Sequence, residues 1–202
     1  MWSYVKNILL GYIYLVFMGM IAWGISYVGS TAAEFAVCLV NVGFYCFVMW
    51  YNLYKEGEAA MNTRYSNDLE REYMVRTGFI RKLKTHEEYK SWKGFLMGGY
   101  VCLPLVLLMI LHLILGTTLG PQYNGGGVAA GVMYLGFYWL YAVFMVSGSG
   151  TVTAMSWGGY FILLYAVIII LATFGIAYIV GGRKAVRQRE MIKDRHKQIY
   201  GE

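Results

Sequence analysis

The stretch that decides the fold class runs from residue 94 to residue 115 and reads GFLMGGYVCLPLVLLMILHLIL. It opens a longer segment, Gly94 to Gly182, that contains no Asp, Glu, Lys or Arg. An α-helix needs about 20 apolar residues to span the hydrocarbon layer of a membrane, and a charge at mid-bilayer costs about 2.5–3.5 kcal/mol. The segment therefore predicts membrane-spanning helices.

The composition of the whole chain agrees with this prediction. Of the 202 residues, 58% are apolar and 14% are charged, whereas soluble domains average about 25% charged residues. A soluble domain of this size leaves roughly a third of its unfolded-chain surface in water, and this chain has too few polar residues to cover it. Soluble, disordered, collagen-like and disulfide-scaffold proteins are excluded. We predict an all-α, polytopic bundle in the lipid bilayer of the cell membrane.

Hydropathy places the helices of this bundle. We predict five hydrophobic helices, at Ile8–Val28, Ala32–Leu53, Gly94–Leu115, Val128–Ser147 and Gly158–Val180. They divide the chain into four parts. These are an N-terminal transmembrane hairpin (1–54), a cytoplasmic amphipathic helical loop (55–93), an uncharged transmembrane region (94–181) and a basic cytoplasmic tail (182–202). The small-x-x-x-small spacing of Gly94 and Gly98 indicates a close helix–helix approach.

The positive charges predict the orientation of these segments. Residues 55–93 contain nine Lys and Arg residues and residues 182–202 contain seven, and basic loops favour the cytoplasmic side. If both regions are cytoplasmic, an even number of crossings lies between them, although three segments are predicted there. We expect four full crossings and one irregular or re-entrant segment, Val128–Ser147, which has Gly-rich flanks. An ordinary crossing by this segment remains the alternative.

The loop 55–93 is predicted to be helical. Asn67, followed by Asp68 and Glu70, is typical of a helix N-cap, and Thr85–Glu88 is typical of a capping box. The resulting amphipathic helices could form a docking surface for the inner leaflet or for a cytoplasmic partner. Alternatively, they form a solvated hairpin that rests on the chain's own bundle.

The candidate ligand-binding residues are polar side chains inside the hydrophobic segments. Tyr134, Tyr138 and Tyr141 share one helical face, His112 is the only histidine in a hydrophobic segment, and Pro104 should kink its helix. We predict that His112 and the three tyrosines line a ligand-binding cavity, as in transporters with discontinuous helices. The alternatives are tyrosines that pack against neighbouring helices and a neutral histidine near the membrane interface.

No catalytic, metal or cofactor site is predicted. The chain has no C-x-x-C pair, no zinc-ligand spacing, no phosphate-binding loop and no common hydrolase motif. Cys102 with His86 or His112 remains a candidate Cys–His pair for a small membrane enzyme. Asn41, between Cys38 and Cys46, is predicted to form a hydrogen bond between helices. Nucleic-acid binding is not predicted, because interleaved acids and the membrane charge bias already explain the basic tail.

These residues favour one function and leave two others open. We expect a non-enzymatic integral membrane protein, a permease-like or accessory subunit that works with other membrane or cytoplasmic subunits. The near absence of intramembrane carboxylates makes a self-contained proton-driven pump improbable. A stand-alone solute-binding protein or facilitator is the alternative, and a cysteine/histidine enzyme is the further one.

Overall fold

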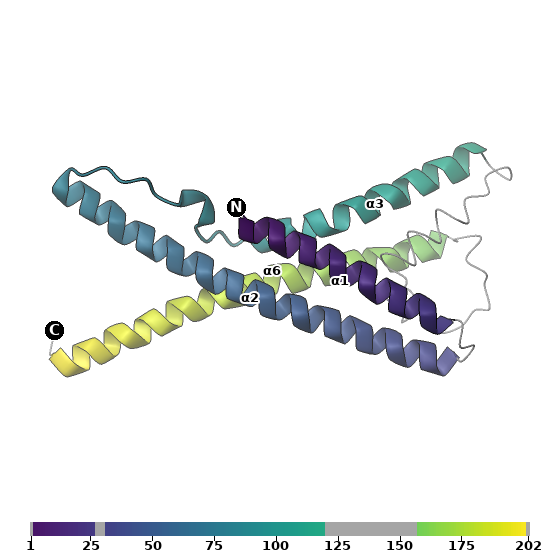
Figure 1. Ribbon diagram of the computed structural model, residues 1–202, viewed down its shortest axis with the longest axis horizontal. Coiled ribbons are helices and arrows are strands. Elements are labelled where there is room, and N and C mark those ends of the chain that lie inside the picture. Colours follow the sequence, from purple (N-terminus) through teal and green to yellow (C-terminus); the bar gives the residue numbers. More distant parts are fainter. Residues whose placement is uncertain (1, 27–30, 120–156, 201–202) are drawn as a thin grey trace.

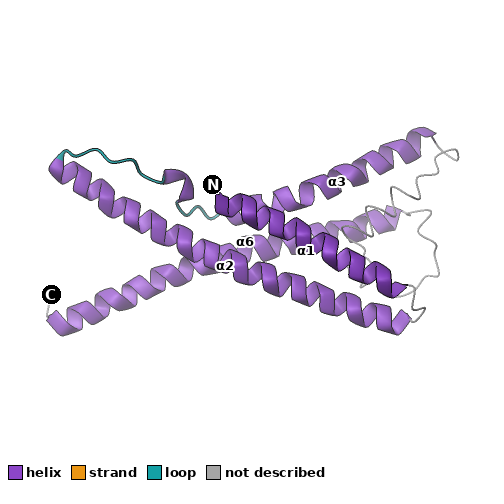
Figure 2. Ribbon diagram, in the orientation of Figure 1, coloured by secondary structure: helices purple, strands orange, loops and turns teal. Residues whose placement is uncertain are grey.

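The computed structural model describes residues 2–26, 31–119 and 157–200. These residues fold into long α-helices and one turn of 3₁₀ helix, and contain no strand (Figures 1 and 2). The helices are α1 (Trp2–Ser26), α2 (Thr31–Thr77), α3 (Lys93–Leu119) and α6 (Trp157–Tyr200), and the 3₁₀ turn is η1 (Thr85–Glu87). The predicted all-α class is confirmed.

The predicted count of five hydrophobic helices is not matched, because the described ranges contain four α-helices. The segment Val128–Ser147, with its tyrosines, lies outside the described residues. Among the described helices, α1, α2 and α6 are each long and apolar enough to cross a membrane. Helix α3 has 27 residues and carries no charged residue after Lys93.

The helices have two very different lengths. Helix α2 has 47 residues and α6 has 44, so they are about 70 Å and 66 Å long at 1.5 Å per residue. That is more than twice the ~30 Å thickness of the hydrocarbon layer. Figure 1 shows that α2 and α6 cross in an X and that α1 and α3 lie along one half of it. The other half consists of the C-terminal parts of α2 and α6 and the loop that follows α2.

The helices run in alternating directions. Helices α1 and α3 start near the crossing and run to one end of the molecule, where α2 and α6 begin (Figure 1). The C-terminal end of α6 therefore lies on the same side of the crossing as the loop between α2 and α3. We call the half of the X that contains α1, α3 and the N-terminal parts of α2 and α6 the four-helix half. Between residues 94 and 182, the described residues pass through it twice, along α3 and along α6.

Two glycines bring α2 and α6 into direct backbone contact. A side-chain carbon on Gly57 of α2 would overlap the backbone carbonyl group of Tyr178 on α6. Likewise, a side-chain carbon on Gly181 of α6 would overlap the carbonyl group of Tyr54 on α2. The contact is reciprocal, because each glycine follows by three residues the tyrosine that touches the other glycine. The close crossing therefore requires glycine on both helices.

Helix α3 packs on α6 through the predicted glycine pair. A side-chain carbon on Gly94 would lie 2.7 Å from the carbonyl oxygen of Phe174, and one on Gly98 would lie 3.3 Å from the Cα atom of Leu171. The close approach expected from the Gly94–Gly98 spacing thus occurs between α3 and α6.

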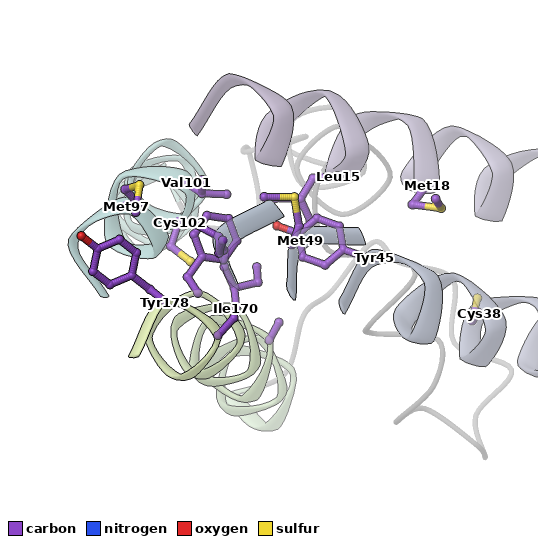
Figure 3. Close-up of a cluster of buried hydrophobic side chains, with 14 of the residues drawn as sticks. Leu15, Met18, Cys38, Tyr45, Met49, Met97, Val101, Cys102, Ile170 and Tyr178 are labelled. Carbon is purple, nitrogen blue, oxygen red and sulfur yellow. The ribbon is translucent and has the colours of Figure 1, made fainter. Parts of the chain in front are cut away.

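The core of the four-helix half is apolar and is built by all four helices (Figure 3). It includes Leu15 and Met18 of α1, Cys38, Tyr45 and Met49 of α2, Met97, Val101 and Cys102 of α3, and Ile170 and Tyr178 of α6, all at most 3% exposed. Cys102 therefore occupies a packing position within this core.

Both predicted helix starts in the loop 55–93 are wrong. Asn67 is not an N-cap, because α2 continues without a break from Thr31 to Thr77 and its side chain bonds instead to a distant residue, Glu88. Thr85 does not open a capping box, because the 3₁₀ turn Thr85–Glu87 is preceded by Lys84 and has no side-chain cap. A polar residue between helix-forming neighbours can cap a helix or bond to another segment, and Asn67 does the second.

Helix α2 ends at Thr77 and is followed by Gly78, which has a φ of +71° and donates its backbone N–H to the carbonyl oxygen of Met74 at 2.8 Å. This left-handed position favours glycine, as in many helix C-terminal caps. Gly78→Ala should therefore lower the free energy of unfolding by about 1 kcal/mol, measured by denaturant titration in detergent micelles. Gly78→Asn is the control, because asparagine tolerates this conformation better, and an equal loss in both variants would contradict the assignment.

Candidate functional site

The half of the molecule beyond the crossing holds most of the charged residues and the described cavities. We call residues 58–77 the α2 arm, residues 182–200 the α6 arm, and residues 78–92 the return loop. The two arms diverge from the crossing, and the return loop runs back along the α2 arm to the start of α3 (Figure 2). The backbone N–H of Tyr89 donates to the carbonyl oxygen of Ala60 at 3.1 Å, which fixes the end of the loop to α2.

Glu88 holds the return loop on the α2 arm. One of its carboxylate oxygens accepts hydrogen bonds from Asn67 Nδ2 at 2.8 Å and from Arg71 Nη2 at 2.5 Å. Arg71 also pairs with Asp68 at 2.6 Å. The Glu88 side chain is 14% exposed and that of Arg71 is 42% exposed, so the carboxylate end of these charge-assisted hydrogen bonds is shielded from water and the guanidinium end only in part.

Lys93 joins the return loop to α1 at the start of α3. Its ammonium group donates to the hydroxyl of Tyr4 at 3.0 Å and to the backbone carbonyl oxygens of His86 and Glu88 at 2.7 Å and 2.6 Å. It also lies 4.9 Å from the centre of the Tyr4 ring, a cation–π distance. Burial lowers the pKa of Lys93, and the neighbouring Lys90 lowers it further.

Replacing Lys93 should therefore loosen this junction. Lys93→Met removes three donated hydrogen bonds and is expected to reduce the free energy of unfolding by about 1–2 kcal/mol, measured by chemical denaturation in micelles. Lys90→Met is the matched control, because Lys90 is exposed and lies 6.0 Å from the Trp92 ring centre. We expect it to change stability by less than about 0.5 kcal/mol. Similar losses in both variants would contradict the role given to Lys93.

Tyr89 packs the loop against α6. Its ring stacks on that of Tyr178, with centroids 5.2 Å apart and an interplanar angle of 3°, and it lies against Gly182, where a side-chain carbon would overlap the ring. Burial raises the pKa of Tyr89, and the nearby positive charge of Arg183 partly opposes this shift. The loop is thus seated between both long helices.

Contacts between the two arms are concentrated near the crossing. Lys184 of α6 pairs with Glu58 of α2 at 3.3 Å and lies 5.1 Å from the Tyr54 ring centre. Farther out, the guanidinium of Arg189 lies 3.9 Å from the Tyr65 ring centre. Arg189 is also among the residues that line the gap where the arms separate.

Described residues of this half line cavities at three places. One, of about 540 Å³, lies between the α2 arm and the start of the return loop and is lined by Ser66, Leu69, Glu70, Tyr73, Met74, Phe79 and Arg81. The second, about 310 Å³, separates the two arms and is lined by Tyr65, Asp68, Leu69, Glu72, Val186, Arg189, Glu190 and Lys193. The third, about 320 Å³, lies beside the crossing and is lined by Tyr54, Val180, Arg183, Lys184 and Arg187.

The predicted ligand site falls outside the described side chains. His112 belongs to helix α3, but its side chain is outside the described part, as are Tyr134, Tyr138 and Tyr141. The prediction that these four residues line a cavity therefore remains a prediction. In the ranges that the structure describes, no cluster of three or more His, Cys, Asp or Glu residues could hold a metal ion.

The structure separates both candidate Cys–His pairs. Cys102 and His112 are ten residues apart in one helix, or about 15 Å along its axis. The carbonyl oxygen of His86 accepts a hydrogen bond from the Lys93 ammonium group at 2.7 Å, so His86 lies beside the start of α3. Lys93 is about 13 Å from Cys102 along the axis of that helix. A nucleophile and its base must lie within hydrogen-bonding reach, so neither pair supports an enzymatic function.

Asn41 is buried among apolar residues of α2 and is 6% exposed. Its Nδ2 atom has no hydrogen-bond partner among the described residues, so the predicted interhelical hydrogen bond is not seen from that atom. Nearby on the helix, Thr173 of α6 donates to the Cys46 sulfur at 3.7 Å. This weaker contact is an interhelical polar bond between described residues of α2 and α6.

The sequence did not reveal the Glu88–Asn67–Arg71 cluster. Its members are 17 and 21 residues apart, a spacing that no helix or turn rule links. Comparisons with protein-family models, with characterised proteins and with solved structures found no match to this chain.

Proposed function

We propose that this chain is a multi-pass protein of the cell membrane that acts as a non-enzymatic accessory subunit of a larger assembly. In this proposal α1, α2, α3 and α6 cross the bilayer. The two arms and the return loop lie in the cytoplasm, where they form the surface that other subunits bind.

The exposed apolar side chains of the four-helix half support the membrane assignment. Leu9, Ile13 and Phe17 of α1 are 53–55% exposed, and Val40 and Phe47 of α2 are 65% and 70% exposed. Because the core between the helices is also apolar, these helices are apolar on both their inner and outer faces. A soluble bundle places polar residues on its outer face, whereas lipid favours this pattern.

The orientation is supported by the charges. The α6 arm carries seven Lys and Arg residues, and Arg81, Lys82, Lys84 and Lys90 lie in the return loop on the same side of the crossing. Lys6 lies near the start of α1, at the crossing end of the four-helix half. With four crossings, all of these bases lie on one side, as the positive-inside rule requires. The proposal keeps the prediction that Val128–Ser147, which lies outside the described residues, makes no full crossing, so that an even number of crossings separates the two basic regions.

The arms and the return loop carry the proposal of an accessory subunit, and their exposed apolar side chains are the single observation on which it rests. Tyr73, Phe79 and Ile80 are 61%, 66% and 91% exposed, and Ile192 and Ile199 are 66% and 70% exposed. These residues extend beyond the expected hydrocarbon layer, so lipid tails do not cover them. Apolar groups left in water in this way mark surfaces that bind other proteins.

The assembly state of the protein tests this function. Purified in mild detergent from its native membrane, the chain should be part of a stoichiometric complex heavier than its own 22.9 kDa. Removal of residues 187–202 should dissociate that complex while the four-helix half stays folded. A chain that remains monomeric and moves a solute across vesicle membranes by itself would contradict the proposal and favour a facilitator.

A further inference from the structure

We infer that the two arms bind a second copy of this chain, with the α2 arm of each copy receiving the α6 arm of the other. This inference rests on the proposed function, since it requires both arms to lie in the cytoplasm, and it names the occupant of the docking surface. The contact joins an apolar groove at Leu69 and Tyr73 to an apolar stripe at Ile192 and Ile199.

The groove on the α2 arm can receive a helix. It is the cavity of about 540 Å³ between the arm and the return loop. Leu69 and Tyr73 are both 61% exposed, and Phe79 on the facing wall is 66% exposed. Residues four apart on a helix lie on one face, so Leu69 and Tyr73 form a continuous apolar strip along the groove.

The α6 arm presents a matching stripe. Ile192 and Ile199 are 66% and 70% exposed, and their seven-residue spacing places both on one helical face. Arg195 lies between them along the helix and is also exposed. The stripe therefore combines apolar anchors with a positive charge, which is typical of an amphipathic helix that docks in a groove.

The groove and the stripe lie on the same face of the V formed by the arms. The gap between the arms identifies the inward-facing residues, which are Tyr65, Asp68, Leu69 and Glu72 on α2 and Val186, Arg189, Glu190 and Lys193 on α6. At 3.6 residues per turn, the groove is centred about a third of a turn from the inward direction of α2, and the stripe about a third of a turn from that of α6 in the opposite sense. Because the arms face each other, opposite rotations bring both surfaces to one face.

The two surfaces also lie at similar heights above the crossing. Measured along the helices from Gly57 and Gly181, Leu69 and Tyr73 lie about 18–24 Å out, and Ile192 and Ile199 about 17–27 Å out. Two copies inserted in the same orientation are related by a twofold axis along the membrane normal. Such an axis places the groove of each copy opposite the stripe of the other.

The charges of the two arms are complementary. The α6 arm has seven basic residues and two acidic ones, whereas the α2 arm has four acidic residues and three basic ones. Within one copy, Lys184 and Glu58 pair near the crossing, but the tips diverge (Figure 1). Glu70 in the groove already pairs with Arg81 at 3.6 Å. The attraction for the basic α6 arm of a second copy is therefore assigned to the exposed Glu72, which lies on the side of α2 that faces the gap between the arms.

Cysteine cross-linking in the full-length protein tests this dimer. Two differently tagged copies, one with Leu69→Cys and the other with Ile192→Cys, are co-expressed in membranes and oxidised. We expect a disulfide-linked product that carries both tags. The control pairs Ile192→Cys with Arg64→Cys, which is exposed and lies about 140° around α2 from Leu69. Wild-type copies measure the background from Cys38, Cys46 and Cys102.

Dimerisation is measured separately by the mass of the protein in nanodiscs. Ile192→Asp should weaken association about tenfold or more. Val75→Asp should leave association unchanged, because Val75 is 86% exposed on the side of α2 away from the groove. Both residues are exposed, so neither change should unfold the chain.

The inference is overturned if Leu69→Cys and Ile192→Cys cross-link no more than the control pair, or if Val75→Asp weakens association as much as Ile192→Asp. If the cross-link is absent but the chain still purifies in a stoichiometric complex that requires the α6 arm, the dimer fails and the proposed function stands. If neither is observed, both fail. Ile192→Asp that releases the arm from vesicles of anionic lipid without changing the mass of the protein would identify a lipid surface as the occupant and would also overturn the dimer.

Discussion

Gly57→Ala and Gly181→Ala are each expected to lower the free energy of unfolding by about 3 kcal/mol, the largest loss that we predict for a single substitution in this chain. An added methyl group at either position would overlap the backbone of the opposite long helix, at Tyr178 or Tyr54. The overlap involves backbone, which cannot move aside by a rotamer change, so the helices must separate along the whole crossing. Overpacking in a close-packed interior typically costs about 1–3 kcal/mol and sometimes more.

Gly43→Ala is the matched control for these variants. Gly43 lies on the same helix α2, and a side-chain carbon there would have no atom within 4 Å. Alanine in a helix interior is favoured over glycine by about 1 kcal/mol, so we expect Gly43→Ala to be neutral or stabilising. Unfolding by SDS titration, followed by tryptophan fluorescence, measures all three variants. A loss in Gly43→Ala as large as in Gly57→Ala would contradict the backbone contact.

Glu88→Ala should have the second largest effect, a loss of about 2–3 kcal/mol in the free energy of unfolding. The substitution leaves the Asn67 amide and the Arg71 guanidinium without their shared acceptor. Removing the mostly buried acceptor of a hydrogen-bonded charge pair costs more than the pair itself contributes, because its donors lose their partner. Because Glu88 holds the return loop on α2, we also expect trypsin to cleave after Lys82 and Lys84 faster than in the wild type.

The adjacent Glu87→Ala provides the comparison for Glu88→Ala. The Glu87 side chain is 38% exposed, and one of its carboxylate oxygens lies 3.6 Å from Nε2 of His86. An exposed pair of this kind contributes little, so its loss should change stability by less than about 0.5 kcal/mol and leave the trypsin pattern unchanged. Equal proteolysis of the two variants would show that Glu88 does not anchor the loop.

The start of each long helix could be predicted from the sequence, but the ends of α2 and α6 could not. The segments expected to begin at Ala32 and Gly158 do begin near there, at Thr31 and Trp157. Hydropathy predicts that these two segments end at Leu53 and Val180, where the run of apolar residues stops. A fall in hydropathy marks the edge of a lipid-facing surface, but only a cap ends a helix, and α2 reaches its cap at Gly78.

The long-range polar contacts were not predictable for a different reason. Asn67 has the residue type and the acidic neighbours of an N-cap, yet its amide bonds to Glu88 across the return loop. Such a contact depends on how the loop folds back, which a local pattern does not contain. The glycines at 57 and 181 carried a partial signal, because each follows a tyrosine by three residues. Only the geometry shows that the two motifs face one another.

The most direct test of the central claim, that four crossings place both arms and the return loop in the cytoplasm, is accessibility labelling in sealed vesicles of known sidedness. Lys84→Cys reports on the return loop and Lys193→Cys on the α6 arm, and both positions are exposed. A membrane-impermeant maleimide should label both cysteines in inside-out vesicles and neither in right-side-out vesicles. Labelling of the two positions from opposite sides, or of both only in right-side-out vesicles, would contradict the account.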